Sequence, residues 1–273
     1  MIVWVTGASS GLGMYIARSL VRRGHTVIGG ARSFRAGTGA DGVHCLPLDV
    51  TSDESVAEFV RGALALYPRV DAVVNAAGIL MLGSCEETSP QEYMRVLDTD
   101  LVGMVRVNSA VLPLMRKQGG GRIMLLSSIN GLLGIPYQSA YTAAKHAVEG
   151  YAECLALEAH RDHVGVCLIE PGDHRGGSDR CRLHAKAMSD VSPHADDFRS
   201  AVATIHRDES HGSDPEKLGE KVARALEKRR MPFRIRIASP DQHAAVYLHA
   251  LLPARAFAAF LRFYYLGRRK ESC

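Results

Sequence analysis

Short apolar runs alternate with amphipathic stretches along most of the chain. The apolar runs predict strands at residues 2–5, 26–29, 43–48, 72–75, 122–127, 164–169 and 233–237. Apolar positions spaced three and four apart predict helices near 11–23, 53–66, 90–117, 138–161 and 214–229. Strands that are apolar throughout are typical of parallel sheets buried on both faces. The alternation predicts an α/β fold, a doubly wound parallel sheet of about seven strands with a C-terminal helical extension.

Two stretches interrupt this rhythm. Residues 33–42 contain three glycines where a crossover helix would be expected, so this connection is predicted to be a loop. Residues 173–193 are polar, follow a strand and precede a new helix. Loops at the carboxyl ends of parallel strands border ligand sites, so we expect this segment to lie over such a site like a lid.

Size and composition agree with a single globular unit. The 273 residues are 47% hydrophobic and 23% charged, which excludes a disordered chain, a collagen or a coiled coil. We expect residues 1–240 to form one domain and 241–273 to extend it. Lys and Arg number 33 against 29 Asp and Glu, and the net charge of +4 predicts a mixed surface, not a nucleic-acid partner.

Cysteine and histidine positions indicate no metal site. The six cysteines are irregularly spaced and form no C-x-x-C pair, which predicts reduced thiols in a cytoplasmic protein. The opening apolar run is too short for a secretory signal. His160 and His163 are interpreted as a helix-end pair without further ligands, and His174, His184 and His194 as solvated side chains of the lid segment.

A glycine-rich turn joins the first strand to the first helix. Gly7, Gly11 and Gly13 allow a tight turn and a close approach of the backbone to a ligand. The free N–H groups and positive dipole end of the following helix favour a diphosphate. A plain strand–helix turn is the alternative, and a P-loop is excluded because no Gly-Lys-Ser/Thr follows.

A second group combines a serine, a tyrosine and a lysine. Tyr141 and Lys145 are four residues apart on a predicted helix and therefore share a face. An ammonium beside a phenol favours the phenolate and lowers its pKa. Ser128 ends the fifth predicted strand, where its hydroxyl can point to the same place. Taken singly, each residue fits an ordinary surface or strand-end position equally well.

Together these motifs resemble the short-chain dehydrogenase/reductase family. The resemblance runs from residue 2 to about residue 237 and covers T-G-x-x-x-G-x-G at 6–13, Asp49 after the third strand, and N-A-A-G at 75–78. It continues with Ser128, Tyr141 and Lys145, and with Pro-Gly at 171–172. Residues 121–150 are especially similar to the steroid- and retinol-type members. The resemblance implies a Rossmann-type fold and an oxidoreductase that interconverts an alcohol and a ketone.

The resemblance also implies residue roles. Tyr141 is expected to be the general acid/base, Lys145 to hold the nicotinamide ribose and lower the pKa of Tyr141, and Ser128 to bind the substrate oxygen. The expected cofactor-binding residues are Gly7, Ser9, Ser10, Gly11, Leu12, Gly13, Arg32, Asp49, Val50, Asn75, Ala76, Gly78, Tyr141, Lys145, Pro171 and Gly172.

Two positions depart from the family pattern. The catalytic asparagine that the family usually has after the fourth strand is replaced here by Asp100. Its backbone role can survive the change, whereas a side-chain role is open. The threonine that commonly follows Pro-Gly is also absent, because residues 173–178 read Asp-His-Arg-Gly-Gly-Ser.

The residues at the end of the second strand indicate whether NAD(H) or NADP(H) is preferred. NAD-preferring relatives usually carry an acidic residue there, but residues 27–32 read Val-Ile-Gly-Gly-Ala-Arg. Arg32 can pair with a 2′-phosphate, and Ser9 can add a hydroxyl. We therefore expect NADP(H) rather than NAD(H), with an exposed Arg32 as the alternative.

The C-terminal segment bears on the substrate. Phe257, Phe260, Leu261 and Tyr264 form one apolar helical face. We expect this helix to pack on its own domain or on another subunit of a homodimer or homotetramer, with contact to a lipid surface less favoured. Together with 173–193 it is expected to build a deep apolar pocket for a bulky lipophilic alcohol or ketone, hydroxysteroid- or retinoid-like. A 3-oxoacyl-thioester reductase and a non-catalytic dinucleotide sensor are the alternatives.

Overall fold

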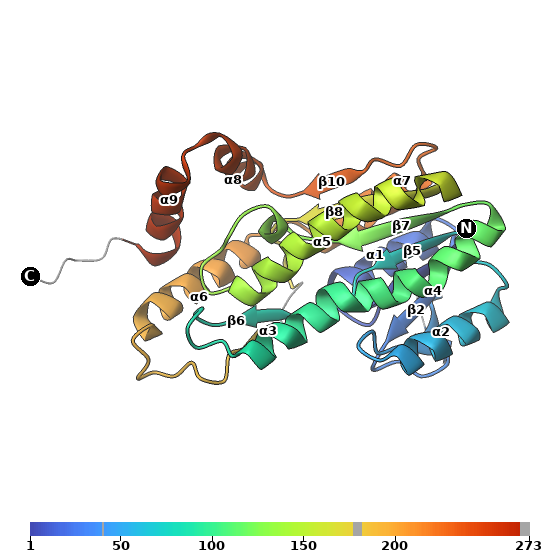
Figure 1. Ribbon diagram of the computed structural model, residues 1–273, viewed down its shortest axis with the longest axis horizontal. Coiled ribbons are helices and arrows are strands. Elements are labelled where there is room, and N and C mark those ends of the chain that lie inside the picture. Colours follow the sequence, from blue (N-terminus) through green and yellow to red (C-terminus); the bar gives the residue numbers. More distant parts are fainter. Residues whose placement is uncertain (40, 177–181, 268–273) are drawn as a thin grey trace, which may run out of the picture.

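A mainly parallel sheet forms the centre of the protein (Figure 1). The computed structural model describes residues 1–39, 41–176 and 182–267. The sheet order is β10-β8-β7-β5-β1-β2-β4-β3. The strands are β1 (Ile2–Thr6), β2 (Thr26–Ala31), β3 (Gly37–Thr38), β4 (His44–Pro47), β5 (Ala72–Asn75), β7 (Gly121–Leu126), β8 (Val164–Pro171) and β10 (Arg234–Ile237).

All seven predicted strands are present, and their pairings are parallel. The glycine-containing connection at 33–42 lacks a helix in its described residues, as predicted, and adds the short antiparallel strand β3. Two further strands, β6 (Leu80–Leu82) and β9 (Arg182–His184), pair in a small separate sheet. Three residues are too few to show a periodicity, so the sequence pattern missed them.

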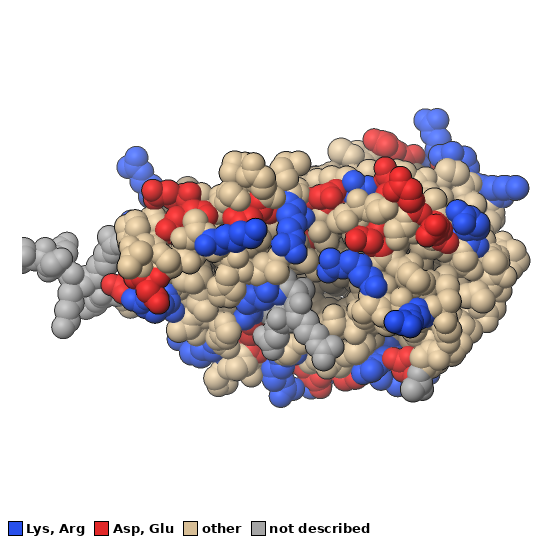
Figure 2. Space-filling model, turned by 90° about the horizontal axis from the view of Figure 1, so that it is seen from below, with Lys and Arg blue, Asp and Glu red and all other residues tan. Residues whose placement is uncertain are grey.

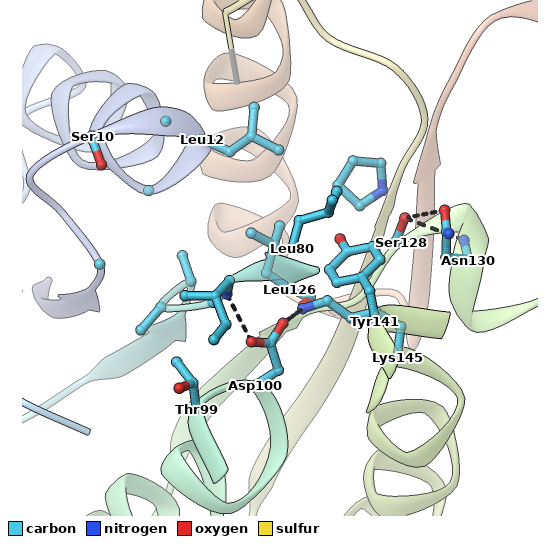
Figure 3. A pocket seen from close by; sticks show the side chains of 18 of the residues that line it. Ser10, Leu12, Leu80, Thr99, Asp100, Leu126, Ser128, Asn130, Tyr141 and Lys145 are labelled. Atoms are coloured by element: carbon cyan, nitrogen blue, oxygen red, sulfur yellow. Dashed lines mark hydrogen bonds and ion pairs between the residues drawn. The ribbon is translucent and has the colours of Figure 1, made fainter. Parts of the chain in front are cut away.

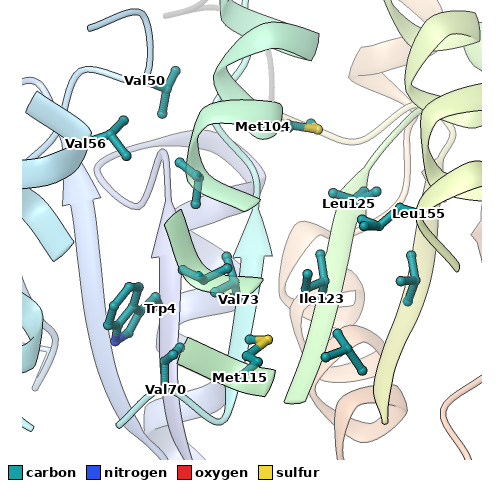
Figure 4. Close-up of a cluster of buried hydrophobic side chains, with 14 of the residues drawn as sticks. Trp4, Val50, Val56, Val70, Val73, Met104, Met115, Ile123, Leu125 and Leu155 are labelled. Carbon is teal, nitrogen blue, oxygen red and sulfur yellow. The ribbon is translucent and has the colours of Figure 1, made fainter. Parts of the chain in front are cut away.

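Helices cover both faces of the main sheet. Residues of α1 (Gly11–Arg22) and α7 (Pro215–Glu227) pack on one face, and those of α2 (Asp53–Leu66), α4 (Gly103–Gln118) and α5 (Ser139–Glu158) on the other. Alternation along β1 separates the two cores, because Trp4 faces α2 while Val3 and Val5 face α1 and α7. The Trp4 ring meets Phe59 edge-on at 5.6 Å, within the core shown in Figure 4.

The helix predicted over 90–117 is divided by a wider turn. Helix α3 (Pro90–Leu97) starts with a capping box between Ser89 and Glu92. A π-helical segment (Asp98–Val102) follows, and α4 continues directly from it. Such bulges insert an extra residue into a helix and are frequent at functional sites. Here the segment carries Asp100, which is fully buried.

Three helices complete the C-terminal half. Helix α6 (Ala195–Ser210) follows the lid segment as expected, and α8 (Pro240–Leu251) and α9 (Ala254–Leu266) follow β10. Figure 1 shows α8 and α9 standing out from the body of the molecule near α6. The predicted apolar face of α9 is only partly covered: Phe257 is buried and Leu261 half-buried, whereas Phe260 and Tyr264 are exposed. No helix of the described residues is long and apolar enough to cross a membrane.

Candidate active site

A cavity of about 630 Å³ opens at the carboxyl ends of the central strands. The predicted cofactor and catalytic residues line it, except Asn75. Figure 3 shows Ser10 and Leu12 on one side of the cavity and Ser128, Tyr141 and Lys145 across from them. The sequence motifs therefore converge on one site, although they are spread over more than half of the chain.

The glycine-rich turn requires two of its glycines for different reasons. Gly7 has φ +67°, in the left-handed region that side chains disfavour. A Cβ on Gly13 would lie 2.4 Å from the carbonyl oxygen of Gly7, so the helix can approach the turn only without a side chain. Ser10 precedes α1 and makes no side-chain capping bond, unlike Ser52 before α2. The first N–H groups of α1 remain available to a diphosphate, so this end of the cavity fits a dinucleotide.

Arg32 and Asp49 lie beyond this turn. Arg32 follows β2, is exposed and lines the cavity. Burial acts to raise the pKa of Asp49, but hydrogen bonds from the Thr51 backbone N–H (3.0 Å) and hydroxyl (2.7 Å), with Arg32 and Arg106 nearby, hold it below its usual value. Asp49 is therefore a hydrogen-bond acceptor at the rim.

Asn75 is predicted to bind the cofactor, and its side chain is turned away from the cavity. Its side chain is buried and donates from Nδ2 to Oδ1 of Asn108 on α4, at 2.9 Å. It does not line the cavity, whereas the neighbouring Ala76 and Gly78 do. Because side chains alternate along a strand, the last residue of β5 turns toward the helices. The Asn75 side chain thus supports the cavity wall from behind.

Lys145 is held at the junction of three elements. Its Nζ donates to the carbonyl oxygen of Leu126 at the end of β7, at 2.9 Å. The same atom lies 3.1 Å from Oδ2 of Asp100 and 5.3 Å from the centre of the Tyr141 ring. Tyr141 and Lys145 are one turn apart on α5, as predicted, and both line the cavity.

Asp100 has a side-chain role that the sequence left open. Its Oδ1 accepts from the backbone N–H of Ile79 at 2.8 Å, while Oδ2 faces Lys145 (Figure 3). Complete burial raises the pKa of Asp100, and Lys145 together with the Ile79 N–H opposes that rise. The two side chains therefore form a coupled buried pair rather than two independent groups.

Ser128 is positioned by the turn that follows β7. Its Oγ accepts from the backbone N–H of Asn130 at 3.2 Å and lies 3.3 Å from Asn130 Oδ1. Asn130 Nδ2 in turn donates to Gln138 Oε1 at 2.8 Å, just before α5 begins. This chain of amides connects the serine to the helix that carries Tyr141. Asn130 and Gln138 also line the cavity, and the sequence analysis did not single them out.

The opposite end of the cavity is built from segments far apart in the chain. Apolar residues there come from β6, β9, α6 and α9, namely Leu80, Leu183, Ile205 and Tyr265. The expectation that the lid segment and the C-terminal helix reach the cavity is confirmed for Leu183 and Tyr265. Residues 177–181 of the lid lie outside the described residues.

Carboxylates lie at the same end. Asp173, Asp208 and Glu209 line the cavity. Glu209 pairs with Arg182, and Asp208 accepts from the hydroxyl of Tyr264 at 2.9 Å. Burial, followed by the charges of Glu209, Asp208 and Asp241, raises the pKa of Asp173 to about 7. Arg207 also pairs with Asp208, so two of the three acids face an arginine, and the acidic environment that the sequence pattern did not reveal centres on Asp173.

His174 was expected to be solvated, and this was wrong. The residue is 5% exposed and lines the cavity. Its Nδ1 lies 2.8 Å from the carbonyl oxygen of Gly172, and burial lowers its pKa. The backbone of His174 bridges to Ser213, which draws this part of the lid against the body of the protein.

Two further observations concern metal ligands and surface charge. Within residues 1–39, 41–176 and 182–267, no group of three or more His, Cys, Asp or Glu side chains is arranged to hold a metal ion. Basic and acidic side chains are interspersed on the face shown in Figure 2. The described site is thus one of hydrogen-bond donors, a buried ion pair and apolar walls.

Comparison with known proteins agrees with this geometry. The sequence profile of the short chain dehydrogenase family matches residues 1–179. The chain belongs to this family. It is an NAD(P)-dependent short-chain dehydrogenase/reductase with a Rossmann-type α/β fold.

Similar proteins cover nearly the whole chain. A 3-ketodihydrosphingosine reductase of Bacteroides thetaiotaomicron is 36% identical over 267 residues, which are 98% of each chain. A short-chain dehydrogenase of Streptomyces avermitilis is 30% identical, with a TM-score of 0.81 and 96% of both chains covered. An alcohol dehydrogenase of Thermococcus sibiricus, solved with 5-hydroxy-NADP, is 25% identical with a TM-score of 0.69, and 88% of this chain and 96% of that one are covered.

Proposed function

We propose that this protein is an NADP(H)-dependent reductase of a ketone on a long-chain lipid, of the sphingoid type. The observation that carries the substrate class is the match to the 3-ketodihydrosphingosine reductase over 98% of both chains. The cavity supports it, because an apolar wall and carboxylates lie at the end away from the glycine-rich turn. Steroid and retinoid ketones, which the sequence alone favoured, become the comparison substrates.

The reaction needs only this chain's side chains and the bound cofactor, which supplies the hydride. Tyr141 donates its phenolic proton to the carbonyl oxygen as the alcohol forms. Ser128 donates a hydrogen bond to the same oxygen and orients it. Lys145 holds the ribose hydroxyls and favours the phenolate that Tyr141 becomes. In the opposite direction Tyr141 accepts the proton.

Asp100 influences the catalytic residue Tyr141 through Lys145. The carboxylate lies 3.1 Å from Nζ and fixes the lysine against β7, where Leu126 accepts from it. When ionised, it also offsets part of the lysine charge, which keeps Tyr141 protonated and suited to reduction. Asp100 is thus a positioning residue, with Tyr141 as the catalytic group.

NADP(H) preference rests on Arg32. No acidic residue ends β2, so nothing there repels a 2′-phosphate. Arg32 lines the cavity beside the glycine-rich turn, with Ser9 and Ser33 near it in the same wall. A guanidinium binds phosphate with two parallel hydrogen bonds, which a ribose hydroxyl cannot match.

The carboxylates favour a substrate that carries a positive charge near its ketone. A sphingoid ketone has an amino group on the carbon beside the carbonyl. Burial, and after it the charges of neighbouring acids, raises the pKa of Asp173, and a bound ammonium would relieve the repulsion by those acids. The same carboxylates disfavour the anionic carrier of a 3-oxoacyl thioester, which makes that alternative weaker.

A substrate panel tests the proposal. The purified protein is given NADPH with 3-ketodihydrosphingosine, a long-chain ketone lacking the amine, a steroid ketone and acetoin, and nicotinamide absorbance is followed. We expect the long-chain amino ketone to have the highest kcat/KM, since each buried CH₂ contributes about 0.8 kcal/mol. Equal turnover of acetoin contradicts a lipid substrate, and a preference for the steroid shifts the assignment to that class.

A further inference from the structure

The most exposed apolar surface of the described residues lies on α8 and α9. Leu248, Leu251 and Leu252 are spaced three and one apart, the first two on α8 and the third just after it, and Leu251 is 79% exposed. On α9, Phe260, Phe263 and Tyr264 have the same spacing, and Phe263 is 60% exposed. Large apolar side chains exposed together on two neighbouring helices mark an interaction site more often than singly scattered ones do. We refer to these six residues as the α8–α9 patch.

Few apolar residues of these two helices are buried against the rest of the protein. In α8 no residue is buried, and in α9 only Phe257 is. Phe257 lies against the ring of His249 at 4.9 Å and so joins α9 to α8. Tyr265 turns to the cavity, and its backbone oxygen accepts from Ser200 on α6 at 3.1 Å. Of the remaining apolar residues, Tyr264 contacts Arg207 and Asp208 of α6, whereas Leu251 and Phe263 stay largely exposed.

The charge along α9 has one sign, and at Tyr264 the helix meets Arg207 and Asp208 of α6. No Asp or Glu occurs between Asp241 and Glu271, whereas Arg255 and Arg262 are both exposed on α9. The sequence after the described residues begins with two arginines and a lysine. Aromatic and aliphatic side chains flanked by arginines are typical of helices that lie in the interface of a bilayer with anionic headgroups.

We propose that the α8–α9 patch docks the protein on the surface of an anionic lipid bilayer. The apolar side chains enter the boundary between headgroups and acyl chains, and Arg255 and Arg262 remain with the lipid phosphates. A second copy of this chain is the competing occupant. It fits less well, because in a symmetric interface Arg255 and Arg262 would find no acidic residue on the facing α9.

Docking also brings the cavity close to a substrate dissolved in the bilayer. This point alone rests on the proposed function. Tyr265 lines the cavity and directly follows Tyr264 of the patch. A helix lying on a bilayer thus holds the substrate end of the cavity beside the acyl chains. A lipophilic ketone can then enter without crossing much water.

The test measures flotation of the full chain with phosphatidylcholine vesicles, with and without phosphatidylglycerol. We expect the protein to float with the anionic vesicles and to be released when salt is raised from about 0.1 M to about 1 M, where charges are screened within roughly 3 Å. The double variant Leu251→Glu/Phe263→Glu should reduce the bound fraction at least about tenfold, because two large apolar contacts are lost. Arg255→Ser/Arg262→Ser should lose the preference for anionic vesicles.

Controls separate the patch from general surface effects. Leu66 on α2 is 47% exposed, so Leu66→Glu makes a similar change outside the patch and should leave flotation unchanged. Arg35→Ser/Arg61→Ser removes two other exposed arginines and should also have no effect. Thermal unfolding of each variant verifies that it is folded.

Three outcomes overturn the proposal. The first is a wild-type protein that floats with neither vesicle, and the second is a Leu251→Glu/Phe263→Glu variant that floats as well as Leu66→Glu. The third is a wild-type oligomer that this variant dissociates in sedimentation without lipid, because the patch would then bind a second copy. Flotation needs no substrate, so failure of the proposed reaction leaves this test intact.

Discussion

The two ends of the cavity are built in different ways. The cofactor end comes from one turn between β1 and α1, where Gly7 and Gly13 set the backbone and α1 offers free N–H groups. The substrate end gathers Leu80, Leu183 and Tyr265 from elements that are far apart in the chain. The first is a property of local backbone geometry, and the second exists only after the chain has folded.

The two ends also differ in charge. Arg32 and the start of α1 favour anions at one end, whereas Asp173, with a pKa raised to about 7, marks an acidic environment at the other. A ligand with a phosphate and one with an ammonium would therefore take opposite ends. Lys145 and Tyr141 lie between, so changes at the two ends should be separable in their effects.

The largest effect on activity is expected for Tyr141, which lies between the two ends of the cavity. Tyr141→Phe removes the transferable proton with little change in volume, so the rate should fall about 10²- to 10⁴-fold while NADPH still binds. Stopped-flow turnover and a fluorescence titration measure the two quantities. Tyr151→Phe is the matched control on the same helix, because Tyr151 bonds to Asn108 and does not line the cavity. Near-normal kcat in Tyr141→Phe would reject the acid/base role.

At the cofactor end, Arg32→Asp should reverse the cofactor preference. Like charges would meet at the 2′-phosphate, and the lost charged hydrogen bonds correspond to roughly tenfold to hundredfold in the NADP(H)/NAD(H) ratio of kcat/KM. The preference among ketones should not change. Arg35→Asp serves as the control three residues further on, and an unaltered ratio in Arg32→Asp would mean that Arg32 does not contact the phosphate.

At the substrate end, Tyr265→Ala should have the complementary effect. Losing one aromatic wall should reduce the preference for a long-chain over a short ketone about tenfold, with the cofactor ratio unchanged. Phe260→Ala is the control on the same helix, since Phe260 is exposed and outside the cavity lining. If both variants lower the preference equally, the effect comes from α9 as a whole, and the two ends are less separable than proposed.

The acidic environment of Asp173 has a consequence for stability. Its pKa of about 7 means that the folded protein keeps a proton that the unfolded chain loses near pH 4, so stability should fall as pH rises between these values. Asp173→Asn removes this slope and should raise the free energy of unfolding at pH 8 by roughly 1–3 kcal/mol. Urea unfolding at pH 5 and pH 8 measures it. A variant no more stable than the wild type at pH 8 would show that Asp173 ionises without penalty.

The smallest effect is expected for Asp100→Asn. A neutral side chain leaves the charge of Lys145 uncompensated, which favours the Tyr141 phenolate, so the corresponding limb of the pH–rate profile should move to lower pH by about one unit or less. The amide can still accept from Ile79. A limb that stays in place would reduce Asp100 to a structural role.

Local sequence patterns predicted much of the fold and of the cofactor end. Apolar runs predicted all seven strands of the parallel sheet, because strands buried on both faces leave a continuous hydrophobic signal. The glycines of the first turn and the four-residue spacing of Tyr141 and Lys145 are likewise local, and the structure has them as expected. Such features depend on backbone geometry within a few residues.

The other features of the site depend on contacts between distant parts of the chain. Asp100 meets Lys145 because a π-helical segment and α5 converge, His174 is buried because the lid is drawn to Ser213, and Asn75 faces Asn108 because of strand register. The acidic substrate end needs segments more than thirty residues apart to come together. Helix α9 was predicted to pack on its own domain or on another subunit, and within this chain Phe257 of its apolar face is buried while Phe260 and Tyr264 stay exposed. Periodicity indicates which residues form a face, whereas the space left by the other elements determines what that face covers.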